Sequence, residues 1–591
     1  MSLKNLVENI KLMTIIWATG LFLVTLTYFL LHKDLIFHDE IFWIGILLSG
    51  MSTYMIISHH KLVAKLVFLF LFGFILYIPH MLSSPNNYHI YDELIHYHTT
   101  SMILETGNID TQSGFIILKY YPTLELLITY FRNMTGGSIF SSGLIIVGII
   151  HSFTIIFLYL FFRNICSEKI ASIGTFAYFF NSSYTHFDTY ISYESIGLPL
   201  LIISLFAISY NKNMSNIKML FVSLILIIGT VVTHHFSSYI LLLFMVILLI
   251  IKIFNIKSIE NVENRKIGTL TFLTGVLIFG WIIYIASILL IYYNRIFSEA
   301  IKGVLGMTLF GDRVTELLSS KFLDVPYYEL VIRRFLYTPV IVILILIAIY
   351  HLYSKKKIDI YIITLTIFSG LFFLSLFGSL TSSFEIGRFS TYGFIGIAFL
   401  IGISIERIQR IRPLKIMAFI TVVFLLIGGV SVGTSPPYRG SYSDSIRIGQ
   451  ETITADSLQS AMWFENHMGR RNPITTDIAT GTVFEHYGYQ ALQKGPIWDV
   501  YISPVVDDKV LSDLRSNGVY FIIIDNRITR TTSELRYFFD RKELYVKDHP
   551  GYGRTKPLPV DYIRKFDNYS IFQEIYDNGN INIYKVMKYQ L

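Results

Sequence analysis

The first 435 residues of the chain contain about thirteen segments of roughly 17–25 predominantly apolar residues. A helix of this length crosses the ~30 Å hydrocarbon layer of a lipid bilayer. A single water-soluble core cannot bury this much apolar sequence. We therefore expect a polytopic α-helical membrane protein. The segments are centred near Phe22, Leu47, Leu71, Gly148, Phe176, Ile203, Leu226, Met245, Ile278, Leu344, Phe368, Ile397 and Phe424.

The character of the sequence changes at Pro436, after the last long apolar segment. The whole chain is 53% hydrophobic and only 15% charged. Residues 436–591, by contrast, include 19 basic and 19 acidic residues, which is the charged fraction of an ordinary soluble domain. In that part we expect a helix over 455–467 and strands over 473–476 and 519–524. The sequence thus predicts a membrane domain over 1–435 and a mixed α/β domain over 436–591.

The charges also predict an orientation. Basic segments such as Lys355-Lys356-Lys357 alternate along the chain with acidic or neutral ones such as His38-Asp39-Glu40. Cytoplasmic loops carry the excess of Lys and Arg, so we expect a cytoplasmic N-terminus and an extracytoplasmic α/β domain in a plasma-membrane protein. The net charge of +7 is then an orientation signal and does not indicate a nucleic-acid partner. With one cysteine, Cys166, the chain cannot form an intramolecular disulfide.

Two adjacent carboxylates, Asp92 and Glu93, lie just beyond the third apolar segment and precede His96 and His98. A carboxylate there could act as a general base that takes a proton from an acceptor hydroxyl or amine. The four side chains could instead bind a divalent cation such as Mg²⁺ or Mn²⁺. An exposed loop with ordinary charges is the third interpretation. The residues alone do not choose among the three.

Other polar groups recur where the chain meets the predicted outer membrane boundary. Tyr121 and Glu125 begin a segment that re-enters the membrane interface after Pro122. His234 and His235 lie between two apolar segments, where a histidine pair can bind an anionic head group, help to hold a cation, or cap a helix. We take these four side chains as candidate substrate-binding residues.

Arg388 is an arginine on the side of the membrane where the positive-inside rule expects few. The planar guanidinium matches a pair of phosphate oxygens better than a lysine ammonium does. We therefore expect a partner for it. The two candidates are Glu385, in a structural ion pair, and the phosphate of a lipid.

Two stretches, DELIHYHTTSMILETGNID from Asp92 and YYPTLELL from Tyr120, resemble the membrane glycosyltransferases of the GT-C type. That superfamily includes the protein mannosyltransferases, the lipid A aminoarabinose transferases and the oligosaccharyltransferase catalytic subunits. The resemblance covers about residues 60–435 and points to a prokaryotic or archaeal member. Two features depart from it. Two extra apolar segments precede the acidic loop, and the tail has no WWDYG-type motif, which argues against an oligosaccharyltransferase of that kind.

The resemblance implies an enzyme that transfers a sugar from a polyprenyl-phosphate donor to an extracytoplasmic lipid, glycan or protein. Asp92 would then be the catalytic base or a metal ligand, with Glu93 as its neighbour. Arg388, with His234 or His235, would contact the phosphate of the lipid. The acceptor would attack the sugar carbon in line, with inversion, while the lipid phosphate leaves.

Two other functions stay open. A transporter or flippase of lipid-linked glycans is expected to carry charges in the middle of the membrane and paired interrupted spans, whereas the polar clusters here lie at the outer edge. A polysaccharide polymerase or ligase of another fold would place its key arginines in one large external loop. In this chain that loop would be the segment 294–335.

Overall fold

The computed structural model of the chain divides into two compact units. The first comprises Met1–Ser83, Ile117–Leu127 and Gly143–Ser441, and the second comprises Ser84–Ile116, Ile128–Ser142 and Tyr442–Leu591. The boundary that the sequence suggests at 435/436 lies outside the described residues. The structure describes residues 9–31, 38–83, 88–109, 116–210, 217–254, 264–291, 294, 327–355, 358–380, 388–434, 453–493, 498–533, 537–540, 551–553 and 556–587.

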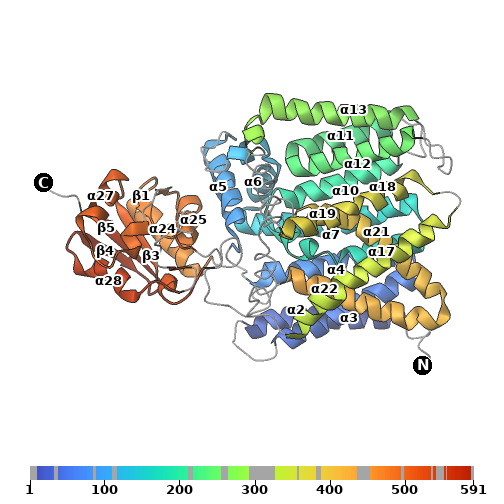
Figure 1. Cartoon of the computed structure of the whole chain (residues 1–591), viewed down its shortest axis with the longest axis horizontal. Helices are drawn as coiled ribbons and strands as arrows, with labels where there is room; N and C mark the ends of the chain where they lie inside the picture. The colour runs from blue at the N-terminus through green and yellow to red at the C-terminus, as the bar shows by residue number, and fades with distance from the viewer. Residues whose placement is uncertain are drawn as a thin grey trace, which may run out of the picture. The chain divides into compact units, whose positions relative to one another are not determined.

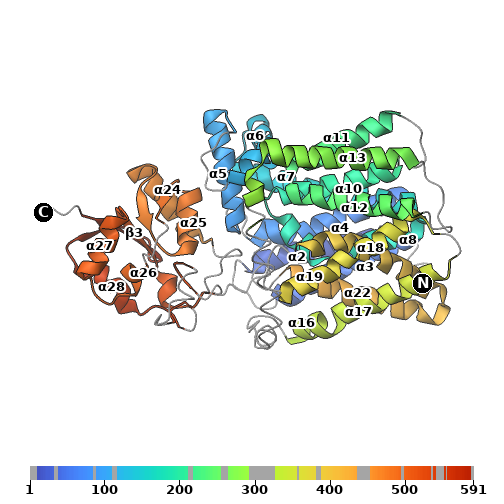
Figure 2. The ribbon, with the colours of Figure 1, turned by 45° about the horizontal axis from the view of Figure 1, so that its top comes forward.

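The first unit is built from helices, and most of the long ones run side by side (Figures 1 and 2). Its boundaries pass through α6 and α7. The helices are α2 (Ile10–Leu31), α3 (His38–His59), α4 (Leu62–Ser83), α6 (Thr123–Thr135), α7 (Ile139–Ile165), α8 (Glu168–Tyr178), α9 (Ser182–Thr185), α10 (Glu194–Tyr210), α11 (Ile217–Thr233), α12 (His235–Ile253), α13 (Asn264–Gly280), α16 (Tyr327–Val331), α17 (Thr338–Tyr353), α18 (Ile360–Phe368), α19 (Gly370–Leu380), α21 (Phe389–Arg410) and α22 (Lys415–Gly433).

Each of the thirteen predicted centres lies in a different helix of this set. Among the described residues, eight helices are long and apolar enough to cross a membrane, and four shorter apolar helices accompany them. The prediction of a polytopic helical protein is therefore confirmed, while the exact number of spans stays a prediction.

Small residues let the first two helices approach closely. A Cβ on Gly20 of α2 would lie 2.7 Å from the carbonyl oxygen of Gly45 on α3, closer than any real Cβ contact. Close backbone approach at small residues is typical of helices that pack within a membrane, where apolar burial alone does not favour association. Any larger residue at Gly20 would separate α2 from α3.

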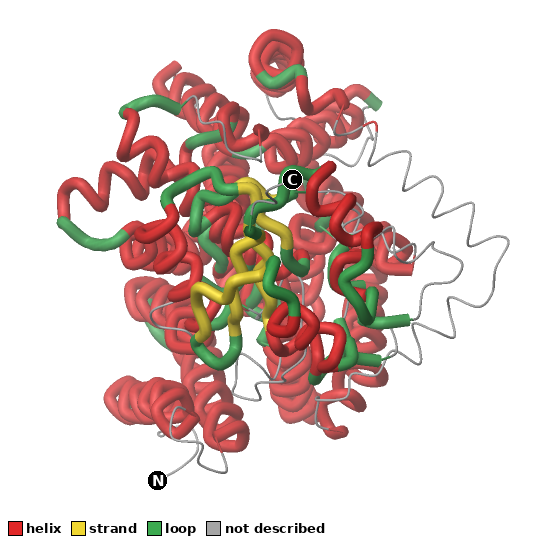
Figure 3. Tube along the Cα trace, turned by 90° about the vertical axis from the view of Figure 1, so that its left-hand side faces the viewer, coloured by secondary structure: helices red, strands yellow, loops and turns green. Residues whose placement is uncertain are grey.

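The second unit combines helix α5 (Tyr91–Thr106) with a small α/β domain near the C-terminus. Figure 3 shows the strands of that domain in yellow. They form one sheet in the order β2-β1-β3-β5-β4, in which β2, β1 and β3 are parallel and β5 and β4 are antiparallel to their neighbours. The elements are α24 (Ala455–Met468), β1 (Pro473–Thr475), α25 (Ile478–His486), β2 (Ala491–Leu492), α26 (Trp498–Ile502), α27 (Asp508–Ser516), β3 (Phe521–Asp525), α28 (Val560–Asn568), β4 (Phe572–Asp577) and β5 (Ile581–Val586).

Strand β3 is the central strand of the sheet and is buried along its whole length. Its sequence, Phe-Ile-Ile-Ile-Asp, has the β-branched and aromatic residues that fit a strand covered on both faces. The predicted helix over 455–467 and the strands over 473–476 and 519–524 match α24, β1 and β3 within two residues at each end. The expected mixed α/β domain is therefore present.

Candidate functional site

Helix α5 carries both predicted catalytic carboxylates in its first turn, where the helix dipole favours negative charge. The Asp92 side chain is exposed. Glu93 is fully buried, and its Oε2 accepts a hydrogen bond of 2.8 Å from the backbone N–H of His89. A glutamate at this position thus reaches back to the segment before the helix, as in a capping box. Of the pair, Asp92 is the carboxylate that faces solvent.

The two histidines of α5 do not join the carboxylates in a metal site. His96 is buried, and His98 donates through Nδ1 to the backbone carbonyl of His486 at 3.0 Å. Burial lowers the pKa of His98. Asp92 and His98 are six residues apart, ~240° around the helix axis. In the described part of the chain, no three His, Cys, Asp or Glu side chains form a group that could hold a metal ion. The metal site predicted from Asp92, Glu93, His96 and His98 therefore stays a prediction.

In the first unit, Arg388 precedes α21 and faces a carboxylate that the sequence did not suggest. Its Nη1 lies 3.8 Å from Oε2 of Glu194, the first residue of α10. Its guanidinium carbon also lies 5.2 Å from the ring centre of Phe187, within cation–π range. The expected ion-pair partner, Glu385, lies outside the described residues, so the protein carboxylate found beside Arg388 is Glu194.

Asp188 is the functional candidate that sequence reasoning missed. It lies in the short turn Phe187–Thr189, is 4% exposed, and neither of its oxygens has a hydrogen-bond partner among the described residues. Burial, with a further contribution from the charge of Glu194, raises its pKa well above the usual range. Burying an acidic side chain between apolar helices costs free energy. An aspartate between two apolar segments is therefore the sequence signal that could have identified Asp188.

A chain of hydrogen bonds connects His234 to the Arg388 ion pair. His234 is the N-cap of α12, and its Nδ1 lies 2.8 Å from the hydroxyl of Ser237. That hydroxyl is 2.9 Å from the hydroxyl of Tyr392 on α21, which in turn donates to Oε1 of Glu194 at 3.4 Å. The cap interpretation of His234 is thus observed. The same chain also brings two predicted substrate-binding residues, His234 and Arg388, into one network.

Close packing fixes the position of this histidine turn. Gly197 of α10 lies against the side chain of His234, and the space between them has no room for a Cβ. The ring of His235 lies 5.4 Å from that of Tyr121 and 5.9 Å from that of Tyr193, between centroids. Tyr121 and His235, both predicted as binding residues, are therefore neighbours.

The start of α6 is attached to the same turn. Thr233, the last residue of α11, donates its hydroxyl to that of Thr123 on α6 at 3.1 Å. Glu125 lies in the first turn of α6 and is completely buried. The predicted site residues therefore form two groups. Tyr121, Glu125, His234, His235 and Arg388 lie in the first unit, and Asp92, Glu93, His96 and His98 lie on α5 in the second.

Solved structures with a similar fold come from the oligosaccharyltransferase of Archaeoglobus fulgidus. The structure with zinc and sulfate aligns with a TM-score of 0.56 at 10% identity, covering 88% of this chain and 73% of that chain. The structure tethered to an acceptor peptide with an NVT sequon aligns with a TM-score of 0.53 at 11% identity, covering 88% and 74%. The chain has an oligosaccharyltransferase fold. A third structure, of the enzyme AglB with an inhibitory peptide and a dolichol-phosphate, aligns with a TM-score of 0.51 at 11% identity, covering 89% and 74%.

The predicted GT-C-type fold is thereby confirmed. The aligned share exceeds either unit alone, so the oligosaccharyltransferase fold of this chain includes parts of both units. No protein-family model and no curated protein sequence matches the chain.

Proposed function

We propose that the chain is a membrane glycosyltransferase that moves a sugar from a polyprenyl-phosphate donor to an extracytoplasmic lipid, glycan or protein. The observation that carries this proposal is the fold shared over 88% of the chain with oligosaccharyltransferase structures, one of which was solved with an acceptor peptide. Another was solved with a dolichol-phosphate. A fold that accommodates a lipid phosphate and an acceptor suits sugar transfer at a membrane surface.

Asp92 is the proposed base. In the reaction, a nucleophilic atom of the acceptor forms a bond to the sugar carbon C1, and the bond from C1 to the phosphate oxygen breaks. The acceptor proton passes to the Asp92 carboxylate, and the lipid phosphate leaves with the electron pair, so the configuration at C1 inverts. Asp92 is exposed, whereas one oxygen of Glu93 is engaged by a backbone N–H, which supports Asp92 as the proton acceptor.

Arg388 is the proposed contact for the phosphate of the donor lipid. A guanidinium carries five N–H donors, more than one carboxylate can accept, so Arg388 can hold Glu194 and a phosphate oxygen together. His234 belongs to the same hydrogen-bonded network, and the ring of His235 lies beside that of His234. The two histidines complete the proposed substrate-binding group. Mg²⁺ or Mn²⁺ stays a candidate cofactor, since one of the similar structures was solved with zinc.

The membrane orientation supports an extracytoplasmic site. Basic connections such as Lys355-Lys356-Lys357 indicate the cytoplasmic side, and the segment that holds Asp92 lies on the other side by this rule. We therefore place the N-terminus in the cytoplasm and the α/β domain outside, in a multi-pass protein of the plasma membrane.

The test is sugar transfer by the purified protein reconstituted in lipid. Labelled polyprenyl-monophosphate and polyprenyl-diphosphate sugars are offered separately with lipid, glycan and sequon-containing peptide acceptors. Arg388→Ala is compared with Arg412→Ala, which removes an exposed arginine from the turn between α21 and α22. We expect Arg388→Ala to raise the KM for the donor at least tenfold and Arg412→Ala to leave it unchanged.

Two results would contradict the proposal. If no donor yields a glycosylated acceptor but labelled lipid-linked sugar crosses the bilayer, the protein is a flippase. If transfer occurs and both arginine variants behave alike, Arg388 is not the phosphate contact.

A further inference from the structure

Helix α5 packs against the α/β domain, although more than three hundred residues separate them in the chain. The ring of its residue Tyr97 packs at a tilt against that of Tyr487, which follows α25, with ring centroids 4.8 Å apart. Tyr88, just before α5, lies 5.4 Å from Tyr97 and 6.3 Å from Tyr487. His98 donates to the backbone carbonyl of His486 at the end of α25. Aromatic packing and a hydrogen bond thus hold α5 against the α/β domain.

Arg470 contacts the C-terminal end of α5 through both terminal nitrogens of its guanidinium. Its Nη1 and Nη2 donate to the two oxygens of Glu105 at 2.7 and 2.9 Å, while its Nε donates to Glu465 at 2.6 Å. The same guanidinium lies over the ring of Tyr489 at 4.0 Å. Hydrogen bonds from Arg470 hold the pKa of Glu105 below its usual range. Exposed ion pairs usually contribute little, but a bidentate arginine within a network is the exception.

Two loops present these groups, and each contains a residue in a strained backbone conformation. Among the described residues, Arg471 (φ 63°) and Tyr489 (φ 55°) are the two non-glycine residues with positive φ. They are joined by a hydrogen bond of 2.9 Å from the N–H of Arg471 to the carbonyl of Tyr489. The ring of Tyr489 also lies 4.8 Å from that of His98. Each such conformation costs about 1–3 kcal/mol and persists where the surroundings require it. Here the strained pair directs Arg470 and Tyr489 towards α5.

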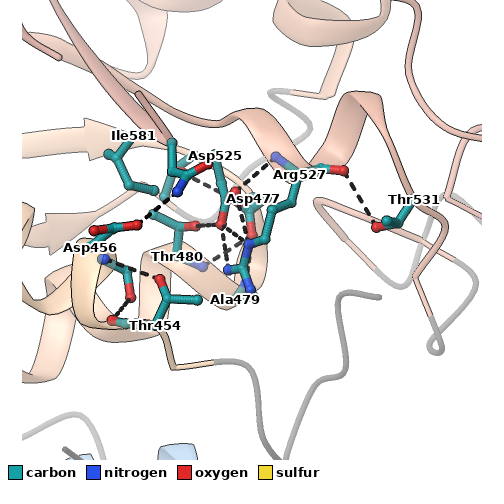
Figure 4. Close-up of polar contacts among 12 residues, drawn as sticks. Thr454, Asp456, Asp477, Ala479, Thr480, Asp525, Arg527, Thr531 and Ile581 are labelled. Atoms are coloured by element: carbon teal, nitrogen blue, oxygen red, sulfur yellow. Dashed lines mark hydrogen bonds and ion pairs between the residues drawn. The ribbon is translucent and has the colours of Figure 1, made fainter. Parts of the chain in front are cut away.

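Arg527 of the α/β domain follows strand β3. Figure 4 shows Arg527 folded back onto Asp525, with a contact of 2.5 Å from Nη2 to Oδ2. The described contacts of the α/β domain with α5 thus involve Tyr97, His98 and Glu105, on the helix whose first turn carries Asp92.

We propose that the α/β domain positions α5 for catalysis, with Arg470 and Tyr489 as positioning residues that fix the helix bearing Asp92. This inference rests on the proposed function, in which Asp92 is the base. A catalytic group must be held within about an ångström of its place, because a displacement of that size can reduce the rate about 100-fold. The α/β domain supplies contacts that can fix α5 in place.

The test is a charge exchange across the Arg470–Glu105 contact in the full-length protein. Arg470→Glu and Glu105→Arg each place like charges together, and the double variant restores opposite charges. Amide hydrogen exchange of α5 and steady-state transfer kinetics are measured for all three. We expect each single variant to lose protection in α5 and to lower kcat about 10- to 100-fold, with the KM for the donor unchanged. The double variant should recover both properties to within about threefold of wild type.

The control is the Lys509–Asp499 pair, an ion pair of 2.6 Å in the same domain with Lys509 largely exposed. Lys509→Asp should change neither α5 protection nor kcat. Unchanged α5 protection in Arg470→Glu overturns the positioning role, and so does lost protection with a normal kcat. Failure of the proposed function has a different signature, because Asp92→Asn would then transfer sugar normally whatever α5 does.

Discussion

Oε2 of Glu194 lies 3.8 Å from Nη1 of Arg388, and both side chains are buried or nearly so. The pair joins the start of α10 to the start of α21. Asp188, a second buried carboxyl group, is close enough for the charge of Glu194 to raise its pKa. Arg388 is thus the described cation beside the buried Glu194, and its charge should control the stability of this end of the helical unit.

Replacing Arg388 by Met should destabilise the protein by about 3–5 kcal/mol, because it removes the described ion-pair partner of the buried Glu194. Thermal unfolding in detergent measures the effect. Adding Glu194→Gln to Arg388→Met should recover part of the loss, since the carboxylate that loses its described cation becomes a neutral amide. Equal melting temperatures for the single and double variants would contradict this account. Arg412→Met, at an exposed site, should shift the transition little.

The α/β domain should respond to pH through Asp477. Burial and the neighbouring Asp525 raise the pKa of Asp477 from 3.8 to about 6. A raised carboxyl pKa means that the folded domain binds the proton more tightly, so stability is highest below pH 4 and falls as pH rises from about 4 to about 6. Asp477→Asn keeps an acceptor for the N–H groups of Ala479 and Thr480 and should remove this fall.

Hydrogen exchange of α25 in the full-length protein, measured at pH 4.5 and 7.5 and corrected for the intrinsic rates, tests this prediction. Each pKa unit is equivalent to about 1.4 kcal/mol. The gain in protection for Asp477→Asn over wild type should be larger at pH 7.5 than at 4.5. The matched control is Asp507→Asn, the same exchange at the exposed N-cap of α27. If both variants show the same pH dependence, the Asp477 assignment is wrong.

Lys565 on α28 caps the end of α26 from a buried position. Its ammonium donates to the carbonyls of Val500, Tyr501 and Ser503. Lys565→Met would leave these acceptors without their donor and should destabilise the domain by about 2–3 kcal/mol. Proteolytic sensitivity of the domain in the full-length protein measures this loss. Lys509→Met, at an exposed site, is the control and should change sensitivity little.

The pH dependence of the same substitution gives a second measurement. Burial lowers the pKa of Lys565 from 10.5 to about 7. The folded domain therefore binds fewer protons than the unfolded chain between pH 7 and 10.5, so wild-type stability rises with pH in that range. Lys565→Met lacks this rise, and its deficit should grow from pH 7 to pH 9. A constant deficit would show that Lys565 keeps an ordinary pKa in the folded domain.

The sequence predicts what depends on local pattern. Each predicted apolar segment, such as those centred at Phe22 and Phe424, lies in a separate helix, because length and hydrophobicity alone identify such segments. The run over 519–524 became the central strand β3, since β-branched and aromatic residues favour a buried strand. His234 was identified as a boundary residue, and helix capping was one of its open roles.

Contacts between distant residues were not predictable. The sequence offers Glu385, three residues away, or a lipid phosphate as the partner of Arg388, whereas the described carboxylate beside it is Glu194, which begins another helix. Nothing local indicates that Glu105 of α5 binds Arg470 of the α/β domain, because that contact depends on the strained residues Arg471 and Tyr489. The metal site was inferred from four residues within seven positions, but helical geometry turns Asp92 and His98 to different sides.

The most direct test of the account is the rate of sugar transfer by Asp92→Asn in a single turnover, with donor saturating. The control is Asp561→Asn, which makes the same change at another exposed aspartate in the first turn of a helix, α28. Loss of a general base should lower the rate about 10²- to 10⁴-fold for Asp92→Asn and leave Asp561→Asn at the wild-type rate. Transfer by Asp92→Asn at the wild-type rate would show that its carboxylate is not the base.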